Sequence, residues 1–450
     1  MQKKTMDMTA GSPVKHILWF ALPLILTNAG QQLYMIADSS IVGRGVGVKA
    51  LAAVGATDWC YWLILWTVGG LAQGFSTFVS RAFGEKNYRE MNQVIAASVM
   101  LCAMIGGFFT VLGLAAARPI LQFLNTPADI LPDAAAYLIT MVSGTLVVMG
   151  YNMAASILRS LGNGRAPLTA MIISALLNIG LDCLFVFVFR WGIIGAAAAS
   201  VIAQAVSFLY CVTAISRIEC IKLDKQAWEL GRQKLAKMLL FGLPIALQYV
   251  VITLGGMILQ SAINTQGSYF IAGYTATNKL YSLLQCFAMS FGMASSTFVA
   301  QNYGAGRMER VKKGVGAAVK IVLIAAILIM AVTLLTRWHV LKVFLDVEEA
   351  GGMEALALAV RYLTIMVLCF PILHILHIFR NVMLALEVSV WPMLSGFGEL
   401  LARILMGKIL IQYFAEDALF LAEPAAWLGA MLCVTLPYFY YVKKLSKERI

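Results

Sequence analysis

Charged residues are scarce in this 450-residue chain. Asp, Glu, Lys and Arg make up 12% of the residues and hydrophobic residues 61%, whereas charged residues approach about 25% in soluble globular proteins. This scarcity excludes a soluble globule. A helix needs about 20 apolar residues to cross a bilayer, and about twelve runs are long enough. These runs cover residues 14–38, 48–80, 92–114, 131–154, 167–189, 193–215, 238–262, 269–301, 314–336, 355–378, 390–414 and 424–442.

The sequence also lacks the motifs of enzymes and of metal or disulfide frameworks. It has no P-loop Gly-Lys-Ser/Thr, so we do not expect ATP hydrolysis by this chain. The eight cysteines include no C-x-x-C pair and lie mostly in apolar runs, as small buried residues do. His374 and His377 form H-x-x-H without the glutamate of a metalloprotease helix. We therefore expect no enzyme, metal or cofactor, and either an ion gradient as the energy source of this chain or a passive role.

The basic residues that give the chain its net charge of +12 are concentrated in particular segments outside the apolar runs. Lys and Arg gather at the N-terminus, in alternate connections, in residues 216–237 and in the C-terminal tail. The other connections hold acids instead, namely Asp129, Asp133, Asp346, Glu348, Glu349, Glu416, Asp417 and Glu423. This is the positive-inside pattern, which predicts cytoplasmic termini and an even number of spans. It also argues against a nucleic-acid partner, because the basic residues form no single surface.

The chain contains two similar halves. The segment Ser76–Gly84 (STFVSRAFG) is repeated as Ser296–Gly304 (STFVAQNYG). The segment Phe20–Pro23 (FALP) is repeated as Phe241–Pro244 (FGLP). Because each half has an even number of spans, both enter the membrane from the same side, as in a parallel repeat. We predict an all-α polytopic membrane protein with twelve transmembrane helices in two six-helix lobes, related by a parallel pseudo-two-fold axis. The expected parts are the lobe 1–215, a cytoplasmic linker 216–237 and the lobe 238–450.

Two acids interrupt the apolar runs of the first half. A charge at the centre of the bilayer costs at least about 2.5 kcal/mol, so Asp38 and Asp182 are expected to face a protein interior or a watery cavity. Tyr34 precedes Asp38 by four residues, and Asn178 precedes Asp182 by four, so each acid has a polar neighbour on its helix face. Two carboxylates in one poorly solvated pocket cannot both ionise easily, so the pair could load and release a proton. The polar residues Tyr137, Asn152 and Ser200 either close around the acids or bond backbone carbonyls in a neighbouring helix.

The second half does not repeat these acids, because Gln260 and Gly407 stand at the equivalent positions. It has other charges within its runs. Glu399 and Arg403 are four residues apart, and we favour a structural pair over a substrate role. Lys279 either lines a cleft or extends its stem toward the outer interface.

These residues, in their order and spacing over 14–443, resemble the multidrug and toxic compound extrusion (MATE) family. The resemblance implies a drug/cation antiporter with a central cleft. In the proton-coupled branch, similar to the DNA-damage-inducible and archaeal members, it implies a hydrogen-bonded cluster in the first lobe. The residues that fit this cluster are Tyr34, Asp38, Tyr137, Asn152, Asn178, Asp182 and Ser200, with Ser200 where Thr is common. A second branch of the family has cation-binding acids in the other lobe, where this chain has Ile252 in place of a Glu. Binding of sodium in the first lobe remains an alternative to proton binding.

The resemblance and the residues together define the expected function. We expect a monomeric exporter of amphipathic or cationic small molecules in exchange for protons, or for sodium, in a prokaryotic plasma membrane. The alternative is a lipid-linked oligosaccharide flippase of the related superfamily. Such flippases usually carry more cationic residues in the central cavity than this chain offers.

Overall fold

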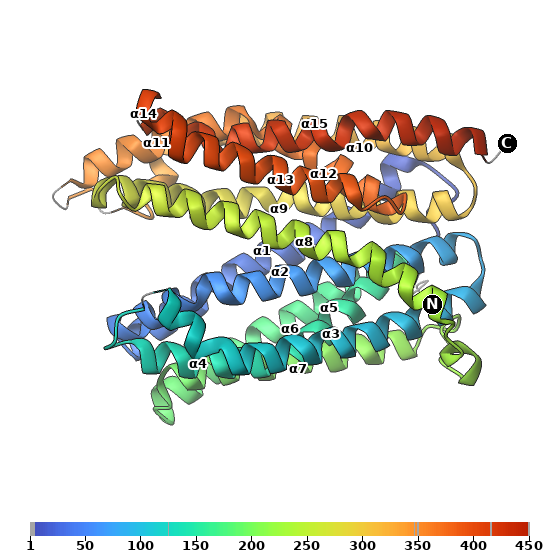
Figure 1. Cartoon of the computed structure of the whole chain (residues 1–450), viewed down its shortest axis with the longest axis horizontal. Coiled ribbons are helices and arrows are strands. Elements are labelled where there is room, and N and C mark those ends of the chain that lie inside the picture. Colours follow the sequence, from blue (N-terminus) through green and yellow to red (C-terminus); the bar gives the residue numbers. More distant parts are fainter. Residues whose placement is uncertain (1–4, 125, 346, 349–350, 415, 449–450) are drawn as a thin grey trace. The chain divides into compact units, whose positions relative to one another are not determined.

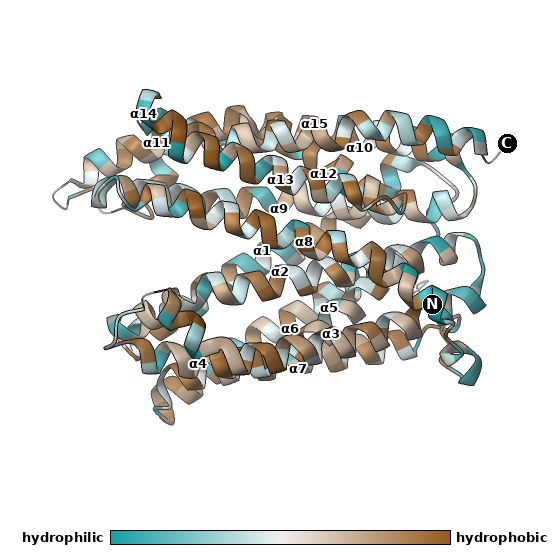
Figure 2. Ribbon diagram, viewed as in Figure 1, coloured by the Kyte–Doolittle hydropathy of each residue, from teal (hydrophilic) through white to brown (hydrophobic). Residues whose placement is uncertain are grey.

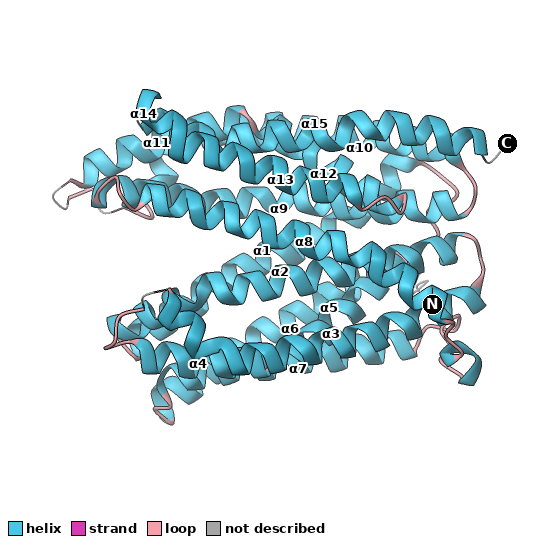
Figure 3. Cartoon of the chain, viewed as in Figure 1, coloured by secondary structure: helices cyan, strands magenta, loops and turns pink. Residues whose placement is uncertain are grey.

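The computed structural model describes residues 5–124, 126–345, 347–348, 351–414 and 416–448. Over these ranges the chain forms helices joined by short loops, without strands (Figure 3). A helix satisfies its backbone hydrogen bonds internally, as a segment in hydrocarbon must. The hydropathy pattern agrees, because hydrophilic residues concentrate at helix ends and in loops (Figure 2). The predicted all-α polytopic fold is confirmed.

The elements follow the predicted runs closely (Figure 1). Those of the first half are α1 (Pro13–Gly45), α2 (Val48–Gly84), α3 (Tyr88–Phe123), α4 (Leu131–Ser143), α5 (Thr145–Ser160), α6 (Arg165–Asp182), the π-helical segment η1 (Cys183–Val188) and α7 (Gly192–Ser216). Those that follow are the 3-10 turn η2 (Lys225–Trp228), α8 (Arg232–Ile263), α9 (Ser268–Gly304), α10 (Met308–Leu341), α11 (Gly352–Leu368), α12 (Phe370–Ala385), α13 (Val390–Ile404), the π-helical η3 (Leu405–Leu410), α14 (Ile411–Phe414) and α15 (Glu416–Glu448).

Within the described residues, 8 helices are long and apolar enough to cross a membrane, and 10 spans result if each bent pair counts as one. The bent pairs are α4–α5, with an angle of 44°, and α11–α12, with an angle of 50°. The two other expected spans correspond to α1, whose polar residues dilute its apolar run, and to α13 with η3, whose run contains the charged residues Glu399, Arg403 and Lys408. The bends and the π-helical segments recur at equivalent places in the two halves, as the repeat predicts.

By packing, the chain divides into two compact units that share two helices. Unit 1 consists of Met1–Met8 and Leu26–Ala246, and unit 2 consists of Thr9–Ile25 and Leu247–Ile450. The division therefore passes through α1 and through α8. The lobes predicted from the repeat keep both helices whole, because a sequence repeat does not record which neighbours a helix packs against.

In unit 1, a core of small and aliphatic side chains packs α1 to α4 against η1 and α7. It includes the fully buried Ala53, Ala134 and Ala197. Small residues let helices approach closely in a membrane, where packing rather than water drives association. The core surrounds Val42, one turn beyond Asp38, and thereby fixes the end of α1 that carries the acid.

In unit 2, aromatic side chains fill the space between α9, α11 and α15. The ring of Tyr362, which is fully buried, lies 5.0 Å from that of Tyr274 and 5.3 Å from that of Phe420. On α9, a Cβ at Gly292 would lie 2.8 Å from the carbonyl oxygen of His377 on α12. Only glycine therefore permits this close crossing of α9 and α12.

Four of the acids expected in connections lie in helices instead: Asp133 in the first turn of α4, and Glu416, Asp417 and Glu423 in α15. Asp346 and Glu349 lie outside the described residues. Glu423 was expected in an acidic connection but belongs to α15, with 13% of its side chain exposed. The expectation was wrong because the apolar run begins at Pro424, whereas the helix begins two turns earlier. Its buried carboxylate has a partner, described below.

Candidate functional site: a buried carboxyl pair

The two predicted acids meet inside unit 1. Asp182 is the last residue of α6 and is fully buried, and its carboxyl group forms a side-chain hydrogen bond with that of Asp38 on α1. Two carboxyl groups can share such a bond only when one of them carries a proton, because an ionised carboxylate only accepts. A proton on either carboxyl group would let the two groups share this bond.

An amide and two hydroxyls extend this pair into a chain. Asn178 Nδ2 donates to Asp182 Oδ2 at 2.7 Å, and its Oδ1 accepts from Ser200 Oγ at 3.2 Å. Ser200 Oγ also lies 3.2 Å from the hydroxyl oxygen of Tyr34. Asn178 is fully buried and Ser200 is 6% exposed. Five of the residues predicted to cluster are thus connected through α1, α6 and α7.

The other two predicted cluster residues differ from each other. Tyr137 is buried on α4 and interacts electrostatically with Asp38 and Tyr34, so it belongs to the surroundings of the pair. Asn152 donates to the carbonyl oxygen of Val148 on its own helix at 2.8 Å. The acceptor is a backbone carbonyl, as in the alternative considered from the sequence, but it belongs to the same helix and not to a neighbouring one.

Two features of the site were missed by sequence reasoning. The π-helical segment η1 begins directly after Asp182, and π-helical turns are frequent at functional sites. Asp58 on α2, which is exposed, and Tyr61 lie within electrostatic reach of Tyr137. An acid inside the run 48–80 was the signal that could have revealed Asp58.

The predicted pair of unit 2 is part of a larger charge network. Arg403 lies 3.4 Å from Glu399, and its Nε and Nη2 each donate to Glu423 at 3.0 Å. Glu399 also accepts from Arg380 on α12. Arg403 Nη1 donates to the carbonyl oxygen of Ile252 on α8 at 3.2 Å. Two cations and two anions, each with at most 13% of its side chain exposed, neutralise one another.

The remaining polar candidates lie apart from both clusters. Lys279 is exposed on α9. Gln260, at the position equivalent to Asp38, donates to Asn264 at 2.8 Å. His374 is fully buried and its Nδ1 lies 2.9 Å from the carbonyl oxygen of Phe370. No group of three or more His, Cys, Asp or Glu residues in the described part of the chain could hold a metal ion.

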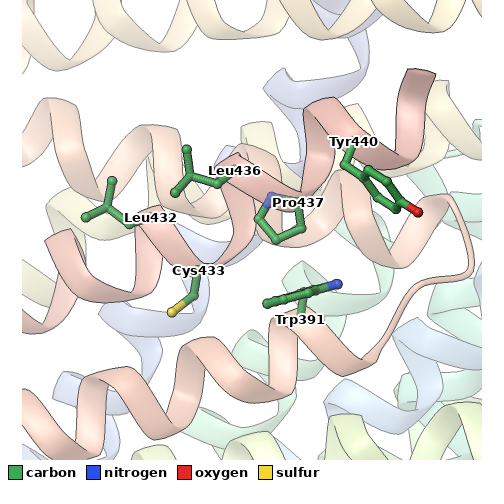
Figure 4. Close-up of a pocket in the computed structure, with 6 residues that line it drawn as sticks. All are labelled: Trp391, Leu432, Cys433, Leu436, Pro437 and Tyr440. Atoms are coloured by element: carbon green, nitrogen blue, oxygen red, sulfur yellow. The ribbon is translucent and has the colours of Figure 1, made fainter. Parts of the chain in front are cut away.

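A groove on unit 2 lacks such chemistry. Trp391 on α13 and the α15 residues Leu432, Cys433, Leu436, Pro437 and Tyr440 line it (Figure 4). Its volume is ≈ 410 Å³ and its lining is almost entirely apolar. Leu436 and Tyr440 are 66% and 65% exposed, as expected for a surface that faces lipid chains. The carboxyl pair, in which Asp182 is fully buried and Asp38 is partly buried, is therefore the better candidate for a functional site.

Long apolar helices in two similar halves, with a carboxyl pair in one half, are typical of a multi-pass membrane transporter. The family model described as MatE matches residues 23–184 and again 244–409, one match in each half. The chain belongs to this family, which confirms the resemblance seen in the sequence.

Proteins with related sequences are similar to this chain over much of its length. A Bacillus subtilis protein named "Probable multidrug resistance protein YpnP" is 32% identical over 68% of this chain and 69% of its own length. "Multidrug export protein MepA" of Staphylococcus saprophyticus is 21% identical over 94% of each chain. Among solved structures, an outward-facing multidrug resistance MATE family transporter has a TM-score of 0.90 at 20% identity, covering 99% of this chain and 100% of its own. That likeness supports the fold.

Proposed function

We propose that this protein is a secondary active exporter that exchanges amphipathic, often cationic, small molecules for protons. The observation that carries the proposal is the hydrogen-bonded pair of Asp38 and Asp182. An ionisable pair inside a membrane lobe is expensive and marks an ion pathway by default. The second half has Gln260 at the equivalent position, so coupling is assigned to unit 1 alone.

The mechanism follows from the charge on the pair. With one shared proton the pair carries a single negative charge, and with a second proton it is neutral. Neutralisation removes the attraction for a cationic substrate and changes the hydrogen bonds that connect α1, α6 and α7. Alternating access would then follow, with proton binding and substrate release favouring one state of the transporter.

Drug-like substrates are supported by the names of the relatives, which include multidrug resistance and multidrug export proteins. One relative, from Shewanella oneidensis and 24% identical over 65% of each chain, is named "FAD transporter". FAD therefore belongs in the substrate panel as an anionic competitor. The flippase alternative has no support among these relatives. We further propose that the protein is a monomer in a prokaryotic plasma membrane, with both termini in the cytoplasm.

Asp38→Asn tests the proposal. Asparagine resembles the neutral carboxylic acid in size but cannot cycle a proton, so the purified variant in proteoliposomes should bind an ethidium-like dye without exporting it along a pH gradient. Asp133→Asn, which changes an exposed acid in the first turn of α4, is the matched control and should retain transport.

Sodium gradients are imposed in a parallel experiment. Transport by the wild-type protein under a sodium gradient alone would show that the coupling ion is sodium and not the proton. Gradient-driven efflux by Asp38→Asn at the wild-type rate and abundance would refute coupling at this pair.

A further inference from the structure

A stripe of polar residues extends along α7 away from the acids. Ser200, Gln204, Ser207 and Cys211 are spaced by four, three and four residues, so they share one face of the helix. At 1.5 Å per residue, the stripe is about 16 Å long. It begins at the hydroxyl that contacts Asn178 and Tyr34 and ends near the last turns of α7. A stripe of this kind in a membrane helix must face protein or water.

A small cavity lies beside this stripe, one turn beyond the acid pair. Its volume is ≈ 20 Å³, and its polar lining consists of Gln31 and Tyr34 of α1, Tyr151 of α5, Ser174 of α6, and Gln204 and Ser207 of α7. A polar cavity needs about 10–15 Å³ to hold one water molecule, so this one has the size and the partners for a water.

The side chains around the cavity have hydrogen-bonding capacity for such a water. Gln204 Oε1 is buried without a hydrogen-bond partner among the described residues. Ser207 Oγ donates to the carbonyl oxygen of Ala170 at 3.0 Å, which leaves its lone pairs available to accept. A buried acceptor without a partner is costly, and a water that donates to it removes this cost.

A second group of polar residues lies at the Cys211 end of the stripe on α7. Tyr151, Cys211 and Arg159 interact electrostatically with one another. Arg159 lies in the last turn of α5, where its Nη2 donates to Ser156 Oγ at 2.7 Å. The positive-inside pattern predicts that this end of the lobe faces the cytoplasm. All of these residues belong to unit 1.

We propose that this stripe and cavity form a water-assisted proton path within unit 1, from the carboxyl pair to the end of the lobe at Arg159. The inference rests on proton coupling at Asp38 and Asp182, and adds the route by which the proton leaves. A proton passes from the carboxyl group to the neighbouring hydroxyl or water as each acceptor gains one hydrogen and gives up another. Gln204 is a positioning residue, since it orients the water through Oε1 and keeps its own protons.

The experiment uses the full-length protein in proteoliposomes with a pH-sensitive dye in the lumen. Gln204→Leu removes the acceptor with little change in volume, and Ser207→Ala removes the hydroxyl. Loss of one buried hydrogen-bond partner is worth on the order of tenfold, so each variant should slow exchange driven by a pH gradient about tenfold. Gln204→Asn, which retains an amide, should recover part of the rate.

Two controls separate the path from folding and from substrate binding. Ser98→Ala removes another fully buried serine of unit 1, one that donates to the carbonyl oxygen of Val94 and lies outside the cavity; it should exchange at the wild-type rate. Substrate counterflow without a pH gradient needs no net proton movement, so Gln204→Leu and Ser207→Ala should retain it.

The outcomes are distinguishable. If Asp38→Asn abolishes gradient-driven exchange while Gln204→Leu and Ser207→Ala match wild type, the path is refuted and proton coupling stands. If Asp38→Asn itself keeps gradient-driven exchange, proton coupling at the pair fails, and the path fails with it. Slow proton exchange with intact counterflow in the two cavity variants supports the path.

Discussion

Replacing Glu399 by glutamine should destabilise unit 2 through its buried charge network. The carboxylate is 5% exposed and lies between Arg380 and Arg403. The amide of Glu399→Gln can still accept a hydrogen bond but carries no charge. Arg403 keeps its two hydrogen bonds to Glu423. Arg380, whose side chain is 12% exposed, instead loses its anionic partner.

The magnitude follows from this geometry. Breaking a buried ion pair by removing one partner costs about 3–5 kcal/mol, and we expect the lower end because Arg403 keeps its second partner. A unit of this size loses about 2–4 °C in Tm for each kcal/mol. Glu399→Gln should therefore lower Tm by roughly 6–12 °C. Adding Arg380→Met, which removes the uncompensated cation, should restore much of this loss.

The assay is thermal unfolding in detergent followed by size-exclusion chromatography, with membrane abundance measured in parallel. Arg361→Gln is the matched control, because the Arg361–Asp417 pair is 54% and 46% exposed. Exposed pairs contribute about 0–1 kcal/mol, so its Tm should change little. A Glu399→Gln variant with wild-type Tm and abundance that no longer transports would show a functional role and refute the structural one.

Two further predictions concern the acids and the orientation of the chain. Asp182→Asn should impair proton-driven efflux less completely than Asp38→Asn, because the remaining acid can still titrate; equal activity of Asp182→Asn and wild type in proteoliposomes would contradict this. Cysteines introduced at Lys225 and Lys443 should react with an impermeant thiol reagent only from the cytoplasmic side, and labelling from outside in intact cells would overturn the predicted topology.

The spacing of polar residues along single helices predicted much of the candidate site. The four-residue steps from Tyr34 to Asp38 and from Asn178 to Asp182 place each pair on one helix face, so the sequence indicated which side chains could meet. Ser200 entered through the family resemblance, and the structure shows it hydrogen-bonded to this group. Their role in coupling stays a prediction.

Contacts between distant helices were harder to predict. Glu423 lies 20 residues from Arg403, and Arg380 lies 19 from Glu399, so no helical spacing connects them. The π-helical turn after Asp182 and the bend at Gly144 also escaped prediction. Hydropathy and helical periodicity locate a span, but a change in backbone hydrogen bonding inside an apolar run leaves the composition unchanged.

The packing of α8 has a consequence for dissecting the protein. Its Arg232–Ala246 part belongs to unit 1, where the ring of Phe241 lies 5.0 Å from that of Phe78, and a Cβ at Gly242 would approach Phe75 to 2.8 Å. In unit 2, Arg310 donates to the carbonyl oxygens of Ala10 and Gly11, just before α1.

A gene cut within residues 216–231 would therefore yield two fragments, each lacking a segment that completes its packing. Separate expression would expose the α2 surface that Phe241 covers and leave the arginine side chains without their carbonyl acceptors. Co-expressed fragments could exchange these segments and reassemble. The half-chains that repeat in sequence are thus not the pieces that are independently complete.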